Sequence, residues 1–263
     1  MSTPVLDKAP APPGRPLGRG ALRLLERNLI IYRRSWILLV SGFFEPVFYL
    51  FAIGISLGQD VRDPLPGVSF AAFAAPAMLA SSAMNGAIFE AAINFFFKLR
   101  YQKTYDAILS TPIEPAEIAL GELGWSLVRG GIYAAGFLAV MVALGLMLSP
   151  WGWLALPAAI FIGLAFGGVG MAAGTFMRSW QDLDLVTAVT LPLFLFSGTF
   201  FELKGVAAWI GQLSPLYHGI ELIRSLTLGN IGPAILWHMG FLVALGSIGL
   251  RITSRRIDRV LKK

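Results

Sequence analysis

The chain lacks cysteine altogether and contains few charged residues. Without cysteine it can form neither a disulfide framework nor a thiolate metal site, and two histidines alone are too few to hold a metal. Charged residues make up 14% of the 263 residues and hydrophobic residues 56%, whereas a soluble domain keeps roughly a quarter of its residues charged. This composition excludes an ordinary soluble domain and predicts an all-α, polytopic membrane protein.

The sequence also lacks the phosphate loop G-x-x-x-x-G-K-[ST], so we expect no cofactor to bind this chain. One hydrolase pattern does occur, G-x-S-x-G at Gly54–Gly58. Its chemistry needs a strand–turn–helix setting and a histidine partner, whereas Ser56 ends a predicted membrane helix. We therefore predict no catalytic residue and keep an intramembrane hydrolase only as an alternative function.

The hydropathy pattern predicts one membrane domain after a disordered tail. Residues 1–20 are rich in Pro, Ala and Gly and are assigned to the tail, and residues 21–263 to the domain. A helix needs about 20 apolar residues to cross the hydrocarbon core. Six stretches approach or exceed that length: Trp36–Leu57, Phe70–Phe97, Gly124–Leu148, Trp153–Phe176, Leu185–Phe201 and Ile231–Leu250.

Basic residues alternate along the chain as the positive-inside rule requires. They are dense before the first span, between the second and third spans and after the sixth, whereas the alternate loops hold only Arg62, Lys204 and Arg224. Both termini are therefore predicted to be cytoplasmic. The net charge of +6 sits beside apolar runs, which fits anionic membrane lipids and not nucleic acid.

A basic amphipathic helix is predicted over residues 21–35, directly before the first span. At about 100° per residue its leucines and Tyr32 fall on one side, and its arginines fall on the other: Arg19, Arg23, Arg27 and Arg34. Such a helix lies in the membrane interface. It acts there either as an anchor that fixes the topology or as a docking element.

A long polar segment, Lys98–Glu122, separates the second and third spans. Within it "STPIE" has the features of a helix start, with Thr111 as N-cap, Pro112 at the first helical position and Glu114 three residues after the cap. We expect a short helix over Tyr101–Leu109, then a break and a helix that continues into the third span. A short helix joined to spans at both ends is a handle by which another protein can move them.

Residues 207–228 are apolar enough to enter the membrane, yet a seventh span there would break the charge alternation. Two short helices that dip in from the outer face and return satisfy both observations. His218, Glu221 and Arg224 are spaced three apart and share one helical stripe. They either neutralise one another or line a substrate path.

Three further ionisable residues lie in or beside the spans: Glu45, Glu90 and Arg129. Charges there are costly unless they are paired or hydrated. Glu90 and Arg129 either pair with each other or contact substrate; if they pair, the losses from Glu90→Ala and Arg129→Ala do not add. A stripe of small residues in the fourth span offers close packing, within the chain or between subunits: Gly163, Gly167, Gly170 and Gly174.

Three segments carry a resemblance to a known family. They are "FFFKLRYQKTYDAILSTPIEPAEIALGE" after the second span, "LPLFLFSGTFF" in the fifth and "LSPLYHGIELIR" after it. From about Leu22 to Leu250 the chain resembles the membrane subunits of ABC-2 type exporters, in the branch with nodulation protein J and the daunorubicin-type drug-export permeases. The resemblance implies an inner-membrane permease of bacteria, a homodimer or heterodimer, with ATP and Mg²⁺ bound on a separate ATPase subunit.

The resemblance also implies site residues. In that family the amphipathic helix and the loop after the second span contact the ATPase; carried over, these contacts fall on Arg23, Arg27, Arg34, Tyr101, Lys103, Thr104, Tyr105, Asp106, Thr111 and Glu114. The family's translocation path runs at the dimer interface, along the first, second and fifth spans. In this chain the resemblance implies that the lining consists of Phe194, Phe196, Ser197, Gly198, Phe200 and Phe201. The alternative for these residues is packing against neighbouring helices.

The expected function is ATP-driven export of an amphipathic cargo. An aromatic, nearly uncharged fifth span suits a drug, a lipo-oligosaccharide or a glycolipid better than a small ion. An ion-coupled secondary transporter is the alternative, and it would need ion sites near the midplane and, commonly, repeated halves. The sequence has no internal repeat and few deep acidic residues.

Overall fold

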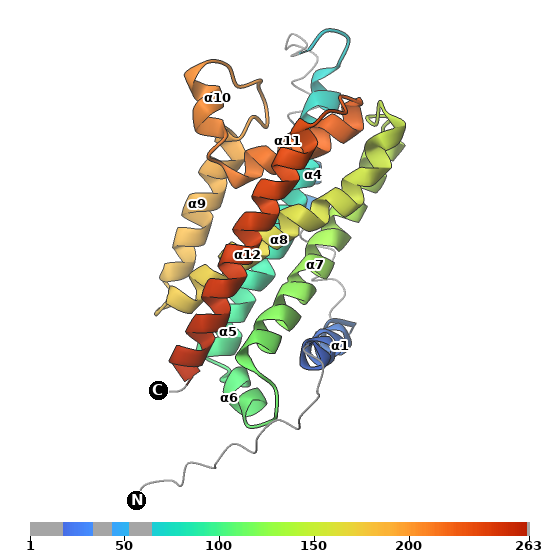
Figure 1. Cartoon of the computed structure of the whole chain (residues 1–263). Coiled ribbons are helices and arrows are strands. Elements are labelled where there is room, and N and C mark those ends of the chain that lie inside the picture. Colours follow the sequence, from blue (N-terminus) through green and yellow to red (C-terminus); the bar gives the residue numbers. More distant parts are fainter. Residues whose placement is uncertain (1–17, 34–43, 53–64, 262–263) are drawn as a thin grey trace, which may run out of the picture.

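The computed structural model describes residues 18–33, 44–52 and 65–261, apart from the side chains of Glu45, Asp258 and Leu261. Residues 1–17 of the predicted tail, Arg34, Ser56 and most of the first span lie outside these residues. The predicted end of the tail at residue 20 is wrong, because Arg19 and Gly20 already belong to the first helix. Every regular element described is a helix (Figure 1). In chain order the elements are α1 (Arg19–Arg33), α3 (Phe44–Tyr49), α4 (Phe70–Ile88), the π-helix η3 (Phe89–Asn94), α5 (Phe95–Arg100), α6 (Thr104–Leu109), α7 (Pro115–Ala143), the 3₁₀ helix η4 (Pro150–Leu154), α8 (Ala155–Phe176), α9 (Asp182–Phe196), α10 (Val206–Gly211), α11 (Pro215–Leu228) and α12 (Ala234–Leu261).

Four helices in the described residues are long and apolar enough to cross a membrane: Phe70–Arg100, Pro115–Ala143, Pro150–Phe176 and Ala234–Ile257. They correspond to the second, third, fourth and sixth predicted spans, so the prediction of an all-α membrane protein is confirmed. For the fifth predicted span, Leu185–Phe201, the predicted C-terminal end is wrong. α9 stops at Phe196, and Gly198 adopts a left-handed φ of +77° that cannot continue a helix. The count of six spans stays a prediction.

The glycine stripe of α8 packs within the chain. A Cβ added to Gly167 would lie 2.6 Å from the Ser126 Oγ of α7, and one on Gly174 would lie 3.1 Å from the Ala92 carbonyl oxygen of η3. On another face, a Cβ on Gly168 would collide with the Gly246 carbonyl oxygen of α12. Small residues thus let α8 approach three neighbouring segments closely and hold the centre of the bundle.

The two ends of the bundle differ. Figure 1 shows α1, α6 and the C-terminal end of α12 at one end, and α10 and α11 at the other. The chain leaves α9 and enters α12 at the α10–α11 end, so residues 206–228 form two short helices and do not cross the bundle. The predicted pair of short helices is therefore confirmed.

The start of α7 corrects the predicted cap. The N-cap is Glu114 and Pro115 opens the helix, whereas the Thr111 hydroxyl donates to the Ile108 carbonyl at 2.6 Å. Either proline suits a first helical turn. The later start prevails because Glu117 closes a capping box with Glu114 and also accepts the Gly20 amide of α1 at 2.9 Å.

Candidate functional site

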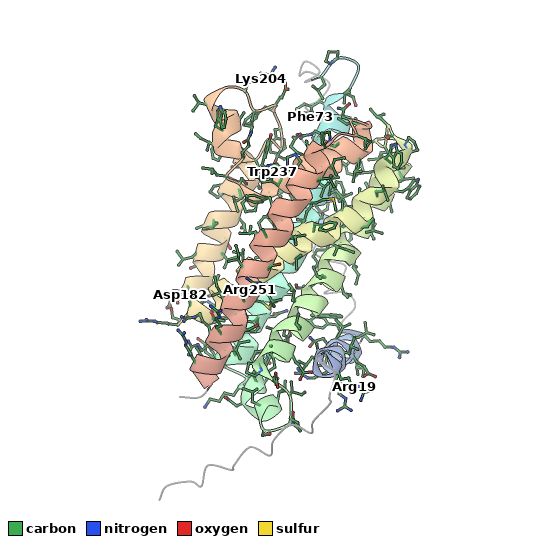
Figure 2. All side chains as sticks on the ribbon, in the orientation of Figure 1. Arg19, Phe73, Asp182, Lys204, Trp237 and Arg251 are labelled. Atoms are coloured by element: carbon green, nitrogen blue, oxygen red, sulfur yellow. The ribbon has the colours of Figure 1, made fainter. Side chains whose placement is uncertain are left out.

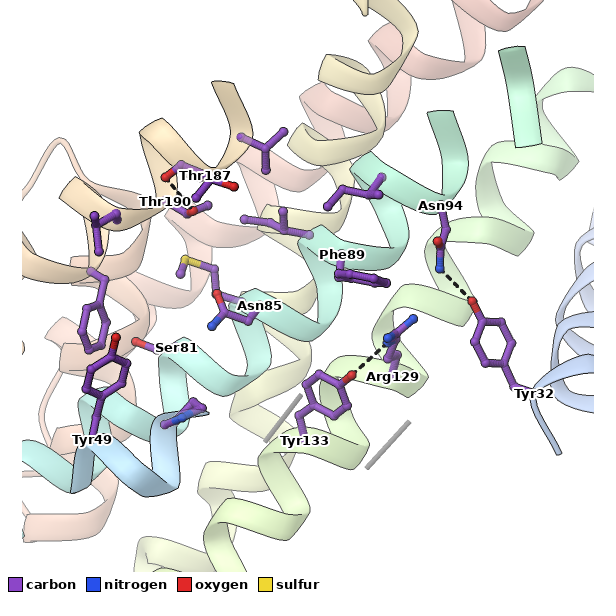
Figure 3. Close-up of a pocket in the computed structure, with 17 residues that line it drawn as sticks. Tyr32, Tyr49, Ser81, Asn85, Phe89, Asn94, Arg129, Tyr133, Thr187 and Thr190 are labelled. Atoms are coloured by element: carbon purple, nitrogen blue, oxygen red, sulfur yellow. Dashed lines mark hydrogen bonds between the residues drawn. The ribbon is translucent and has the colours of Figure 1, made fainter. Parts of the chain in front are cut away.

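A cavity of about 540 Å³ lies between α9 and the α4–η3 helix, beside α3, α7 and the end of α1. Figure 3 shows its lining, with Thr187 and Thr190 of α9 across from Asn85 and Phe89. The apolar part comes mainly from Met84, Ile88, Ile93, Val186, Leu191 and Phe194. The polar part comes from Tyr32, Tyr49, Ser81, Asn85, Asn94, Arg129, Tyr133, Thr187 and Thr190.

The polar wall is organised around Arg129 of α7. Its guanidinium donates to Glu90 Oε2 at 2.9 Å and to the Tyr133 hydroxyl at 3.2 Å, and it lies 4.5 Å from the centre of the Phe89 ring. The predicted pair of Glu90 and Arg129 is therefore present. Arg129 also lines the cavity. Its partners therefore hold the guanidinium in one orientation beside any molecule bound there.

Behind this wall lies a buried ionic network. Lys98 of α5 bridges Glu90 at 3.1 Å and Glu122 of α7 at 2.7 Å. With Arg129, the part of this network that the structure describes contains two cations and two carboxylates, whose formal charges cancel. Such a network is tolerated in a span because its charges are paired. Glu90 belongs to the π-helical turn, a type of irregularity found frequently at functional sites.

The amphipathic helix α1 is part of this network. The Tyr32 hydroxyl accepts from Asn94 at 2.7 Å, as Figure 3 shows. The same hydroxyl donates to Glu90 at 3.0 Å, and the Asn28 side chain donates to Glu122 at 3.3 Å. Burial and the Glu90 carboxylate raise the pKa of Tyr32 above its ordinary value, so its phenol stays protonated. Movement of α1 must therefore disturb the groups that hold Arg129.

The aromatic residues predicted for the path divide into two groups. Phe194 lines the cavity and packs against Tyr49, with ring centres 5.6 Å apart. Phe196 and Phe201 are exposed on the outside of this chain, and Phe200 packs edge-to-face on Phe194. Ser197 and Gly198 are buried beyond the end of α9, where Ser197 Oγ lies 2.6 Å from Ser214 Oγ. Of the six predicted residues, only Phe194 contributes to this cavity.

The charged stripe of α11 is also corrected in part. Arg224 pairs with Glu221 at 2.6 Å and donates to the Gly198 carbonyl at 2.8 Å, so it secures the turn after α9. His218 does not join them. Its Nδ1 lies 2.8 Å from Nδ1 of His238 and its Nε2 lies 2.8 Å from the Gln212 carbonyl oxygen. The spacing of residues within α11 contained no sign of a partner on α12.

Most of the predicted ATPase contacts lie at the α1–α6 end of the bundle. Tyr101, Lys103, Asp106, Thr111 and Glu114 are exposed there. Further residues of this set are the exposed Arg23 and the half-buried Arg27 and Thr104. We call these exposed and half-buried residues, together with the exposed face of α6, the handle surface.

Tyr105 of α6 is a correction, because its side chain points inward and is fully buried at 0% exposure. Its ring lies 5.3 Å from that of Phe95 of α5, which fastens α6 to the second span. Burial and the Glu122 carboxylate raise the pKa of Tyr105 well above its usual range. A buried, neutral phenol cannot contact a partner directly, so Tyr105 supports the handle from below.

Two substitutions distinguish a buried support from a surface contact. Tyr105→Phe is expected to leave stability nearly unchanged, because the hydroxyl has no hydrogen-bond partner among the described residues. Tyr105→Asp is expected to cost about 3 kcal/mol or more, because it places a second carboxylate beside that of Glu122 in the core. Thermal unfolding of the purified chain in detergent measures both. Equal melting temperatures for the two variants would place Tyr105 at the surface.

The polar lining from α4 and α9 was missed by sequence reasoning. Ser81 and Asn85 are four residues apart, and Thr187, Thr190 and Phe194 are spaced by three and four, so each set shares one helical face. This spacing is a usable signal for a polar stripe on each helix. The predicted lining was based on the aromatic residues of the fifth span, and these residues do not reveal the polar stripe.

The fold and the cavity define a class of protein. A bundle of membrane helices holds a cavity large enough for an organic molecule, and a buried network connects that cavity to a helical handle at one end. These are the features of the membrane subunit of a transporter. Residues 21–228 match the family model described as ABC-2 type transporter.

Relatives agree with the family match. The chain is 33% identical to nodulation protein J of Rhizobium leguminosarum bv. trifolii over 90% of its length and 91% of the relative. It is 30% identical to nodulation protein J of Rhizobium meliloti (strain 1021), covering 89% and 91%. It is 25% identical to the inner membrane transport permease YadH of Escherichia coli (strain K12), covering 76% and 78%. The chain belongs to the ABC-2 type transporter family and is the membrane subunit of an ABC exporter.

Proposed function

We propose that the chain exports an amphipathic cargo from the cytoplasm through the cavity between α4–η3 and α9. The observation that carries this proposal is the composition of the lining, in which hydroxyl and amide groups surround Arg129 and apolar side chains fill the rest. A cargo with a polar head and an apolar body suits such a site. Drug, lipo-oligosaccharide and glycolipid cargos all meet this description.

We propose that a separate ATPase subunit binds ATP and Mg²⁺ and acts on the handle surface. The position of α6 supports this, since it connects the second span to α7 and is attached to α5 by the buried ring of Tyr105. Force on α6 or α1 would reach Glu90 through Tyr32 and Lys98, and from there Arg129. The cavity would then change shape when the ATPase subunits close.

The proposed orientation places the α1–α6 end in the cytoplasm of a bacterial inner membrane. Figure 2 shows Arg19 toward this end and Lys204 at the opposite one. Lys98, Arg100, Lys103 and the arginines of the last turns of α12 also belong to the α1–α6 end. This bias is the one that the positive-inside rule associates with the cytoplasmic side.

A second permease copy, identical or related, is proposed to lie against the outer side of α9. No residue of α9 is fully buried in the described chain, although the helix is apolar. Phe196 of α9 and Trp209 of α10 are also 67% and 75% exposed. A path at a dimer interface would explain why one wall of the cavity is packed so lightly in a single copy.

The alternatives have less support. A secondary transporter needs carboxylates that can take up a coupling ion, and the described Glu90 and Glu122 are already bridged by Lys98. A hydrolase needs a histidine beside Ser56. His218 and His238 instead contact each other, and Ser56 lies outside the described residues.

A bulky residue in the cavity tests the path. Asn85→Trp is expected to lower export at least about tenfold, because an indole fills the space beside Arg129. The control is Ile248→Trp on the exposed outer face of α12. Compounds that disappear from the medium of a deletion strain are identified by mass spectrometry, and their levels are compared between the two variants. Normal export by an Asn85→Trp protein that still binds its ATPase would contradict this path.

A further inference from the structure

A second cavity of about 710 Å³ lies along a neighbouring face of α9, and α8, α12 and η3 also bound it. It is a separate cavity from the proposed path, although Ile88 of α4 and Val186 and Thr190 of α9 border both cavities. Hydrocarbon side chains dominate its walls, among them Val169, Ala173, Phe176, Leu185, Val189 and Leu245. We call it the rear groove.

The rear groove has the length of one lipid chain. Its α9 wall runs from Asp182 to Leu193, which spans about 16 Å at 1.5 Å per residue. This is about half of the ~30 Å hydrocarbon core of a bilayer. The groove therefore extends through roughly one leaflet, and it starts at the end of the bundle that carries α6.

Cations mark the membrane-surface end of the groove. Arg178 borders it, is exposed and forms no ion pair within the described residues. Arg256 lies 3.6 Å from the centre of the Phe176 ring, another wall residue, and donates to the Thr175 hydroxyl at 3.0 Å. The nearby Trp180 is exposed, and tryptophan is enriched at the level of lipid headgroups.

Acidic residues are also present at this end, in the first turn of α9. The Asp182 carboxylate accepts the backbone amides of Arg178 and Ser179 at 2.7 and 3.1 Å, and these bonds lower its pKa. Asp182 thus stays an anion that attracts the Arg178 guanidinium through space, but the two form no salt bridge, so the guanidinium can still bind a phosphate. Asp184 follows in the same turn, where a carboxylate favours the helix N-terminus.

We propose that the rear groove binds an acyl chain of an anionic phospholipid, whose phosphate is held by Arg178 and Arg256. An apolar groove between spans is covered by hydrocarbon in a bilayer, and basic pockets between membrane helices select anionic headgroups. The bound chain supports α9 on the face next to the one that lines the cargo cavity. The site does not depend on the identity of the cargo.

Photolabelling tests the proposal on the full chain in native membranes. The probe is phosphatidylglycerol with a diazirine in its acyl chain, and phosphatidylcholine with the same chain is the comparison. Labelled peptides are expected to map to residues 166–178 and 182–193, with more label from phosphatidylglycerol. Arg178→Gln should reduce phosphatidylglycerol labelling about fivefold and leave phosphatidylcholine labelling unchanged. Lys204→Gln, at the opposite end, is the matched control.

Filling the groove gives a second, independent readout. Ala173→Phe on the α8 wall and Val189→Phe on the α9 wall should each reduce labelling by both probes, and thermal unfolding shows whether each variant is folded. Equal labelling of the wild type by the two lipids would overturn the proposal. So would unchanged labelling of Ala173→Phe and Val189→Phe, provided that both variants are folded. A photoreactive residue at position 189 that captures a second copy instead of lipid would also overturn it. None of these readouts uses transport, so they stand apart from the proposed path.

Discussion

Glu90→Ala is expected to destabilise the folded chain by about 3–5 kcal/mol, because it removes the shared partner of two buried cations. The Glu90 side chain is buried and its carboxylate receives Lys98, Arg129, Tyr32 and Asn94. Its removal leaves the Arg129 cation without its carboxylate inside a membrane span. The expected results are low yield, a lowered melting temperature and loosened attachment of α1.

The control for this prediction is Glu202→Ala. Glu202 also forms an ion pair, with Lys204 at 2.9 Å, but both side chains are exposed. Its loss should therefore cost less than about 1 kcal/mol. The double variant Glu90→Ala/Arg129→Ala should lose less than the sum of the single losses, with a coupling energy of about 1–3 kcal/mol. Strictly additive losses would show that the pair does not act as a unit.

Gly121→Ala is expected to displace α1 from α7 and to uncouple transport from the ATPase. A Cβ at this position would lie 2.7 Å from the Leu24 Cβ and 3.0 Å from the Ala21 carbonyl oxygen. Neither atom can move away unless the backbone of α1 moves with it. The overpacking should cost about 1–3 kcal/mol. Because α1 carries Tyr32 and Asn28, the displacement should also break the bonds to Glu90 and Glu122.

Gly131→Ala provides a closely matched control, since it makes the same change in the same helix. A Cβ there meets nothing within 4 Å. Alanine exceeds glycine in helix propensity by about 1 kcal/mol, so this variant should be at least as stable as the parent. Melting temperature, protease sensitivity of residues 19–33 and cargo export are measured for both. Identical behaviour of the two variants would mean that α1 does not depend on close packing at Gly121.

Together these contacts explain how a signal at one end reaches the cavity. Glu117 joins the start of α7 to the first turn of α1, and Lys98 joins the second span to α7. Tyr32 and Asn28 then connect α1 with the same carboxylates that position Lys98 and Arg129. The handle and the polar wall therefore belong to one hydrogen-bonded unit.

Features governed by topology and composition were predictable from the sequence. The distribution of Lys and Arg excluded a seventh span over residues 207–228, and α10 and α11 are indeed two short helices. Spacing alone indicated that Glu90 and Arg129 lie at similar depths in adjacent spans, and they pair at 2.9 Å. A charged side chain within a membrane is stable only when it is paired or hydrated. The positions of such residues in the sequence therefore indicate which spans pack together.

Features governed by helix rotation and by distant partners were not predictable in the same way. Phe196 and Phe194 are equally aromatic, yet only Phe194 faces the cavity. Choosing between Thr111 and Glu114 as the cap required knowledge that α1 places its amides on Glu117. Likewise, His218 finds His238 twenty residues away across a helix interface. Composition does not contain these contacts, because they arise only when the helices pack.

The central claim is that an ATPase drives this membrane subunit through the handle surface, and a pull-down tests it most directly. The charge swap Lys103→Glu/Asp106→Arg alters that surface without changing net charge, and Glu202→Lys/Lys204→Glu does the same at the opposite end. The solubilised chain is captured from its native cells, and co-purified proteins are identified by mass spectrometry. The wild type and the distal swap should recover an ATPase that contains a phosphate loop, and the handle swap should not. Recovery of that ATPase by all three proteins, or by none of them, would contradict the account.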